Sequence, residues 1–117
     1  MNIKENAIIC ARALDERHGR DVKIIDVGDK SSFTDYIILV SAKNERLLGA
    51  LTEEAENIIA KTGSLSLKSI EGKKESGWIL MDYGDMLVNI LTEEMREKYN
   101  IEKIWADCDI LDWKEED

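Results

Sequence analysis

The chain has 117 residues, of which 44% are hydrophobic and 35% charged, and its 25 acidic against 16 basic residues give a net charge of −9. This length suits one domain with one core, and no apolar run approaches the roughly 18 residues that indicate a membrane span. The excess of carboxylates repels phosphate backbones, which argues against direct, sequence-specific nucleic-acid binding and favours a basic protein surface as partner.

The amino terminus and the cysteines carry no sign of export, metal binding or a cofactor. Residues 1–6 have neither the apolar core of a signal peptide nor the arginine-rich composition of an organelle presequence, so we expect a cytoplasmic protein. Cys10 and Cys108 have no nearby histidine and lack the paired spacing of zinc ligands. We therefore expect reduced thiols, no metal and no cofactor.

Hydrophobic spacing in the first half of the chain predicts two helices and two strands. Apolar residues at helical spacing are followed by a glycine cap, and the second strand is apolar throughout, which is typical of a sheet centre. In chain order we expect a helix over residues 2–18, strands over 22–27 and 36–40, and a helix that starts near Ser41 or Asn44 and ends at Gly63.

The second half of the chain predicts a strand, a hairpin and a third helix. We expect strands over residues 65–70, 78–82 and 86–91, a helix over 92–100 and a helical turn over 101–105. Residues 107–117 are rich in acidic side chains and predict a frayed, solvated tail, unless Ile110, Leu111 and Trp113 dock. The chain therefore predicts an α/β fold, with one domain over residues 1–106 and a mixed five-stranded sheet flanked by helices.

The hairpin is the most informative segment. Trp78 lies on the same strand face as Leu80 and Asp82, whereas Ile79 and Met81 point the other way, so one of the two sets must face away from the core. If the Trp78 face is exposed, a large aromatic beside an aspartate has the composition of an interface hot spot. The pattern alone leaves the choice between the two faces open.

The hairpin also carries a family resemblance. Together with residues 26–36, 71–72 and 94–105, residues 77–91 resemble the ribosomal silencing factor family, also called Iojap, and the resemblance runs from Ile3 to about Asp107. It implies an α/β domain with a nucleotidyltransferase-like topology that lacks the catalytic carboxylate pair. The chain departs from the family at Asn89, where a histidine is common, so a proton switch at that position is not expected.

The resemblance also implies a function and a contact surface. Members of the family bind the large ribosomal subunit through ribosomal protein L-fourteen, block joining of the small subunit and repress translation, especially when nutrients are scarce. By the same resemblance, Tyr99 and Trp105 mainly pack inside the domain and Arg96 is a rim contact. The remaining residues implied in partner binding are Trp78, Leu80, Met81, Asp82, Tyr83, Gly84 and Asp85.

Two further functions are weighed against this one. A divergent nucleotide-binding or nucleotidyltransferase-type enzyme would need two carboxylates two residues apart on one strand face to hold Mg²⁺, but Asp35 is followed at that spacing by Ile37. We therefore expect no enzymatic activity, and we expect the polar residues from Asp29 to Asp35 to cap a turn. The second is a homodimer whose exposed hairpin pairs with itself.

Overall fold

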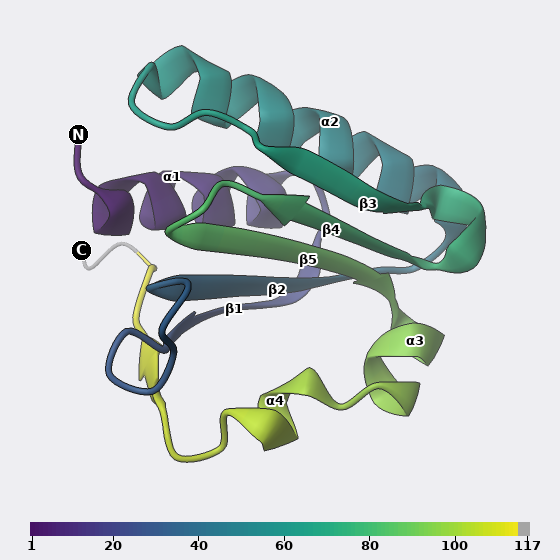
Figure 1. The fold of residues 1–117 in the computed structure, drawn as a ribbon. Helices are drawn as coiled ribbons and strands as arrows, with labels where there is room; N and C mark the ends of the chain where they lie inside the picture. The colour runs from purple at the N-terminus through teal and green to yellow at the C-terminus, as the bar shows by residue number, and fades with distance from the viewer. Residues whose placement is uncertain (115–117) are drawn as a thin grey trace.

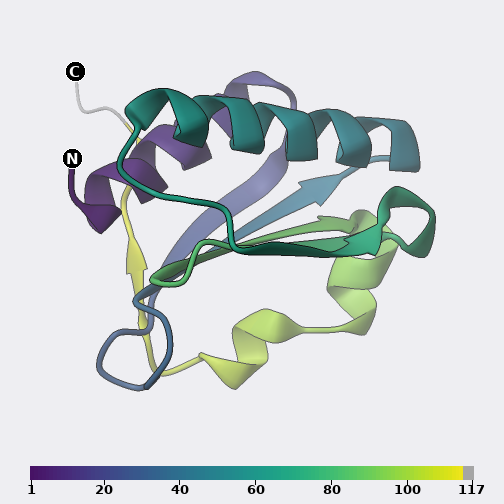
Figure 2. The same cartoon turned by 45° about the horizontal axis from the view of Figure 1, so that its top comes forward.

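The computed structural model describes residues 1–114 as one mixed sheet with helices on both faces (Figures 1 and 2). In both views α1 and α2 lie together over one face, and α3 and α4 lie on the other. The elements are α1 (Ile3–Glu16), β1 (Arg20–Asp26), β2 (Tyr36–Ala42), α2 (Glu45–Thr62), β3 (Ser69–Lys73), the 3-10 turn η1 (Lys74–Ser76), β4 (Trp78–Asp82), β5 (Met86–Thr92), α3 (Glu93–Lys98), α4 (Ile101–Ile104) and β6 (Asp109–Leu111).

The sheet has the order β3-β4-β5-β2-β1-β6. Strands β2 and β5 are parallel and all other neighbours are antiparallel, so the sheet is mixed, as the sequence predicts. It has six strands instead of the expected five, because the chain beyond Asp107 adds a strand at the edge. Strand β2 is buried at nearly every position, which confirms its place inside the sheet.

Polar side chains set the ends of the helices. Asn2 and Glu5 form a reciprocal capping box at the start of α1, and the Asn44 side chain accepts a hydrogen bond of 2.8 Å from the Leu47 N–H at the start of α2. Gly63, with a φ of 69°, ends α2 as predicted. The expected helix over 92–100 is shorter, because α3 ends at Lys98 and α4 begins at Ile101.

The strand expected over residues 65–70 is displaced toward the carboxyl terminus. Leu65 and Leu67 pack against the core from an irregular segment, and the ladder of β3 begins only at Ser69. Alternation of apolar and polar residues therefore indicates which side chains face inward, but not where backbone pairing starts. Among residues 1–114, no helix is long and apolar enough to cross a membrane.

Two apolar clusters hold the layers together. The larger one lies between the sheet and the α1–α2 layer and includes the fully buried Leu14, Ile38 and Leu51. The smaller one, on the opposite face, is built on Ile37 and Leu91 and is covered by side chains from α3, α4 and the segment after them. Burial of each such side chain contributes about 1.5 to 3 kcal/mol, so the second cluster stabilises the position of two short helices.

The carboxyl-terminal segment docks over residues 109–113 instead of fraying, which is the alternative that the sequence leaves open. Strand β6 pairs with β1, and the indole N–H of Trp113 donates a hydrogen bond of 2.9 Å to the Val22 carbonyl. Trp113 is buried and Leu111 is half-buried, whereas Ile110 stays exposed. Burial of a tryptophan outweighs the solvation that the acidic composition favours. Residues 115–117 of the expected tail lie outside the described residues.

Candidate partner-binding groove

A groove of about 390 Å³ opens between the hairpin and α3. Its floor is the face of β4 that points away from the larger core, and its far wall is one side of α3 and the residue that follows it. The lining residues are Glu71, Gly72, Ser76, Trp78, Leu80, Met95 and Tyr99. The groove is therefore mainly apolar and aromatic, with one carboxylate at its border.

The register of the hairpin decides which face of β4 lines this groove. Ile79 and Met81 are buried in the larger cluster, so Trp78, Leu80 and Asp82 point to the opposite face. This settles the choice that the sequence pattern leaves open. Trp78 is half-buried and its ring lies 5.3 Å from the ring of Tyr99, at an angle of 41° between the planes. The two aromatic side chains form one continuous wall of the groove.

Asn89 fixes the orientation of Trp78. Its side-chain oxygen accepts a hydrogen bond of 3.0 Å from the Trp78 indole N–H across the hairpin, and Asn89 itself is buried. The sequence marks this position as a departure from the family but gives no sign that it holds the tryptophan. Sequence reasoning also missed Met95, although its spacing of four from Tyr99 places both on one side of the chain as it leaves α3.

The hairpin turn, at the end of β4 opposite Trp78, is acidic and tightly held. The Asp82 carboxylate accepts a hydrogen bond of 2.7 Å from the Gly84 N–H, and Gly84 has a φ of 86° that favours glycine. The Asp85 carbonyl accepts hydrogen bonds of 2.9 and 3.2 Å from the N–H groups of Asp35 and Tyr36, which ties the turn to the loop before β2. Asp85 is exposed and Asp82 half-buried, so both carboxylates are reachable from solvent.

Three of the predicted contact residues have buried side chains. Met81 lies in the larger core, and burial is the first cause that raises the pKa of Tyr83 to about 12. Arg96 is 8% exposed, so the expectation of an exposed rim contact is wrong for its side chain. Conversely, Tyr99, expected mainly to pack, is 43% exposed as part of the groove wall.

Arg96 instead links the helices α3 and α4 to the strands that they cover. Its guanidinium donates hydrogen bonds to the Asp21 carbonyl at 2.6 Å, to Ser41 Oγ at 3.1 Å and to Glu102 at 3.2 Å. Burial would raise the pKa of Glu102, but hydrogen bonds from Lys23 and Arg96 lower it below the ordinary value. The network joins β1 and β2 to α3 and α4 and so positions the wall that carries Tyr99.

Comparison with known proteins decides the family. The family model described as "Ribosomal silencing factor during starvation" matches residues 1–117. The chain belongs to the ribosomal silencing factor family. It is 30% identical over 112 residues to the ribosomal silencing factor RsfS of Bacillus subtilis, covering 96% of this chain and 94% of that protein.

Two further matches extend the comparison beyond bacterial relatives and to a solved structure. The chain is 31% identical over 95 residues to "Mitochondrial assembly of ribosomal large subunit protein 1" of Mus musculus, covering 80% of this chain and 42% of that protein. A crystal structure of a Chromobacterium violaceum protein superimposes with a TM-score of 0.84 at 25% identity, covering 91% of this chain and 88% of that one. These matches confirm the resemblance and the α/β fold predicted from the sequence.

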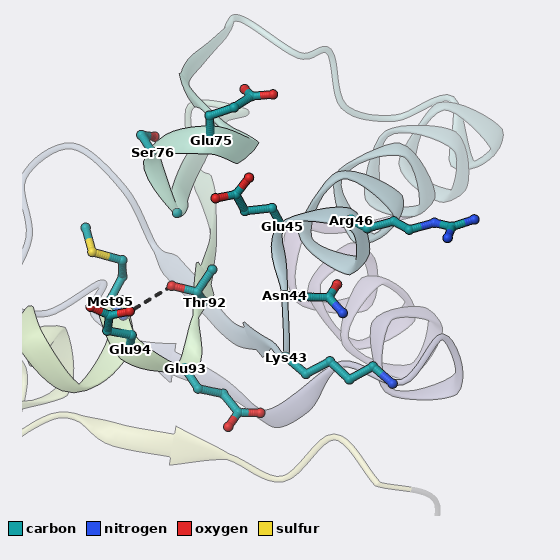
Figure 3. A pocket seen from close by; sticks show the side chains of 11 residues that line it. Lys43, Asn44, Glu45, Arg46, Glu75, Ser76, Thr92, Glu93, Glu94 and Met95 are labelled. Atoms are coloured by element: carbon teal, nitrogen blue, oxygen red, sulfur yellow. Dashed lines mark hydrogen bonds between the residues drawn. The ribbon is translucent and has the colours of Figure 1, made fainter.

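A larger hollow of about 700 Å³ lies where the parallel strands β2 and β5 end (Figure 3). The helices that follow these two strands cover opposite faces of the sheet, and such a switch point is where open α/β sheets commonly bind nucleotides. Here four carboxylates and two cations line the hollow; these are Glu45, Glu75, Glu93, Glu94, Lys43 and Arg46. In this family member carboxylates outnumber cations in the lining, which disfavours a phosphate group.

The structure also bears on enzymatic activity and on self-pairing of the hairpin. Ile37 is buried in the sheet where a transferase would need its second carboxylate, whereas Asp35 is exposed. Within residues 1–114, no group of three or more acidic, histidine or cysteine side chains is placed to hold a metal ion. Strand β4 is paired with β3 and β5, and β5 is also paired with β2, so this hairpin has no free strand edge for pairing with a second copy. The free edge on that side of the sheet belongs to β3.

Proposed function

We propose that this chain binds the large ribosomal subunit through ribosomal protein L-fourteen, on the face that meets the small subunit. The bound protein occupies space on that face, so it prevents the small subunit from joining and represses translation, chiefly when nutrients are scarce. Membership of the silencing factor family supports this proposal, as does the similarity to a mouse protein named for assembly of the large ribosomal subunit.

The groove, on the same hairpin as the acidic turn, is the observation that carries the proposal. Trp78, Leu80 and Tyr99 offer apolar and aromatic surface that is only partly buried, and Glu71 supplies a carboxylate in the groove lining. Asp82 and Asp85 add negative charge at the other end of β4. Aromatic anchors with a charged border are typical of interface hot spots. The negative charge suits a basic ribosomal protein, because complementary charge speeds encounter and fixes register.

The proposed contact set is smaller than the set that the family resemblance implies. Trp78, Leu80, Asp82 and Asp85 supply accessible side chains, and Gly84 supplies turn backbone. The remaining three act through the positions of their neighbours, because their side chains are buried; these are Met81, Tyr83 and Arg96. We place this action in the cytoplasm and propose that it proceeds by binding without turnover of a substrate.

Co-sedimentation with purified ribosomal subunits tests the target. We expect the protein to pellet with large subunits and not with small ones, and to inhibit formation of the joined ribosome in a light-scattering assay. Asp85→Lys places like charge against the basic partner and is expected to weaken pelleting at least tenfold, whereas Glu53→Lys on the exposed side of α2 leaves it unchanged. Equal pelleting with both subunits would contradict the proposal.

A divergent nucleotide-binding enzyme calls for a separate experiment. Thermal-shift titration with the four nucleoside triphosphates and Mg²⁺ is expected to leave the melting temperature unchanged. A saturable rise that Asp35→Asn removes would favour such an enzyme instead. A second copy paired at the free edge of β3 is another candidate partner, and a doubled mass in light scattering at micromolar concentration would support it.

A further inference from the structure

A second hollow, at one end of the sheet, differs in charge from the rest of the surface. It lies between the end of α1, the start of β1 and the residue after β2, measures about 360 Å³ and is lined by His18, Gly19, Arg20 and Lys43. Each of the four other hollows described within residues 1–114 has at least one carboxylate in its lining. Basic side chains and a glycine are therefore concentrated here in a chain of net charge −9.

The backbone keeps this hollow open. The chain leaves α1 with hydrogen bonds from the His18 N–H to the Asp15 carbonyl at 3.2 Å and from the Gly19 N–H to the Leu14 carbonyl at 2.9 Å. A Cβ at position 19 would lie 2.6 Å from the Val40 side chain and 2.7 Å from the Leu14 carbonyl oxygen, so only glycine fits. The glycine therefore lets the chain turn closely against Leu14 and Val40, which places His18 and Arg20 on either side of the hollow.

The polar side chains around the hollow are available to bind an incoming anion. Among the described residues, the side chains of His18 and Lys43 make no hydrogen bond or ion pair. Arg20 pairs with Glu93 at 2.7 Å, but both side chains are at least half exposed, and an exposed pair of this kind is weak enough to rearrange. Lys43 also lines the larger hollow, where its side chain extends away from Glu93 (Figure 3).

Strand register places this hollow on the same end of the sheet as the groove. Trp78 on β4 is paired with Leu91 on β5, Leu91 with Ser41 on β2, and Ser41 with Arg20 on β1. Four neighbouring strands span about 14 Å, so the backbones of Trp78 and Arg20 lie in one row within reach of a single partner surface. A surface that fills the groove can therefore meet the hollow as well.

We propose that His18, Arg20 and Lys43 bind one phosphodiester group of RNA on the large ribosomal subunit, next to the protein contact made by the groove. This proposal rests on the proposed function. The lining itself contains two cations, an imidazole and no carboxylate, which suits a phosphate once Arg20 leaves Glu93, and such a contact positions a protein without reading sequence. It adds to binding only when the groove already holds the protein on the subunit, because the net charge of −9 opposes binding to free RNA.

The salt dependence of binding to large subunits tests this contact. Loss of one phosphate contact is expected to lower the slope of log Kd against log salt concentration by roughly one and to weaken binding at low salt. We expect this change for Lys43→Gln. The matched control is Lys61→Gln, an exposed lysine at the other end of α2, which is expected to keep the wild-type slope. Circular dichroism should show equal melting temperatures for both variants.

The outcomes separate this contact from the proposed function. If the wild-type chain does not pellet with large subunits, the proposed function fails. If it pellets and Lys43→Gln keeps the wild-type slope, or Lys61→Gln changes the slope equally, the phosphate contact is overturned and the groove proposal stands. A photo-crosslinker attached at position 43 of the full chain should capture ribosomal RNA, and capture of ribosomal protein alone would also overturn the contact.

Discussion

At the scale of single residues, the groove depends on polar groups whose role lies in their position. Asn89 accepts the indole N–H of Trp78, and Arg96 directs its guanidinium to Asp21, Ser41 and Glu102 instead of a partner. In the sequence, Asn89 stands out as a departure from the family and Arg96 as a charged residue. The sequence alone does not predict the role of either side chain. A hydrogen bond between side chains eleven positions apart depends on hairpin register, which local pattern fixes only loosely.

Asn89→Leu is expected to release the Trp78 ring. The substitution removes the acceptor and leaves a half-buried N–H unpaired, which costs about 1 to 3 kcal/mol of stability. In a two-dimensional NMR spectrum the Trp78 indole N–H resonance should shift upfield, while the resonances of Trp105 and Trp113 serve as internal controls. An unchanged Trp78 resonance would show that Asn89 does not hold the ring.

Glu102 is expected to make stability depend on acidic pH. Its pKa is lowered in the fold, so the unfolded chain binds its proton more tightly, and its stabilising contribution is complete above the ordinary value of 4.5 and is lost as pH falls through the lowered folded value. Glu102→Gln should therefore be less stable than wild type at pH 7, with the difference shrinking by about pH 3 in urea unfolding. The exposed Glu97→Gln is the control, and a pH-independent difference for Glu102→Gln would contradict the assignment.

At the scale of elements, the sequence predicts which segments fold but not all of their limits. The limits of an element are predicted well where several sequence features agree. Helix α2 is an example, because it has an apolar stripe, an asparagine cap and a terminal glycine. The weakest prediction was the carboxyl-terminal tail, because the acidic composition of residues 107–117 argued for solvent while Trp113 argued for docking. Composition averages over a segment, whereas one buried tryptophan decides where that segment lies.

Trp113 is expected to hold β6 on the sheet. Trp113→Ala removes a buried ring and its hydrogen bond to Val22, and comparable truncations cost about 3 to 5 kcal/mol. For a domain of this size we expect the melting temperature to fall by roughly 10 °C or more. Trp113→Phe keeps most of the buried area and should lose much less. A melting temperature unchanged by the alanine variant would mean that the tail contributes nothing to the fold.

At the scale of the whole molecule, the two faces of the sheet differ in how completely they are covered. The α1–α2 face carries the larger core, and the opposite face is covered only in part by two short helices, which leaves the groove of Trp78, Leu80 and Tyr99 accessible. The fold class follows from the sequence because periodicity reports burial. The groove cannot be predicted in this way, because its shape depends on how α3 and α4 pack on the smaller cluster.

Binding of Trp78→Ala to purified large subunits tests the central claim most directly, that the groove holds the partner. Truncation of a central interface tryptophan costs about 2 kcal/mol or more, so we expect the Kd from co-sedimentation to rise roughly thirtyfold or more, while the melting temperature falls by only a few degrees. Trp105→Ala, in the smaller cluster, is the control and should lower stability instead. If Trp78→Ala unfolds the domain but binds normally per folded molecule, the groove is not the contact surface.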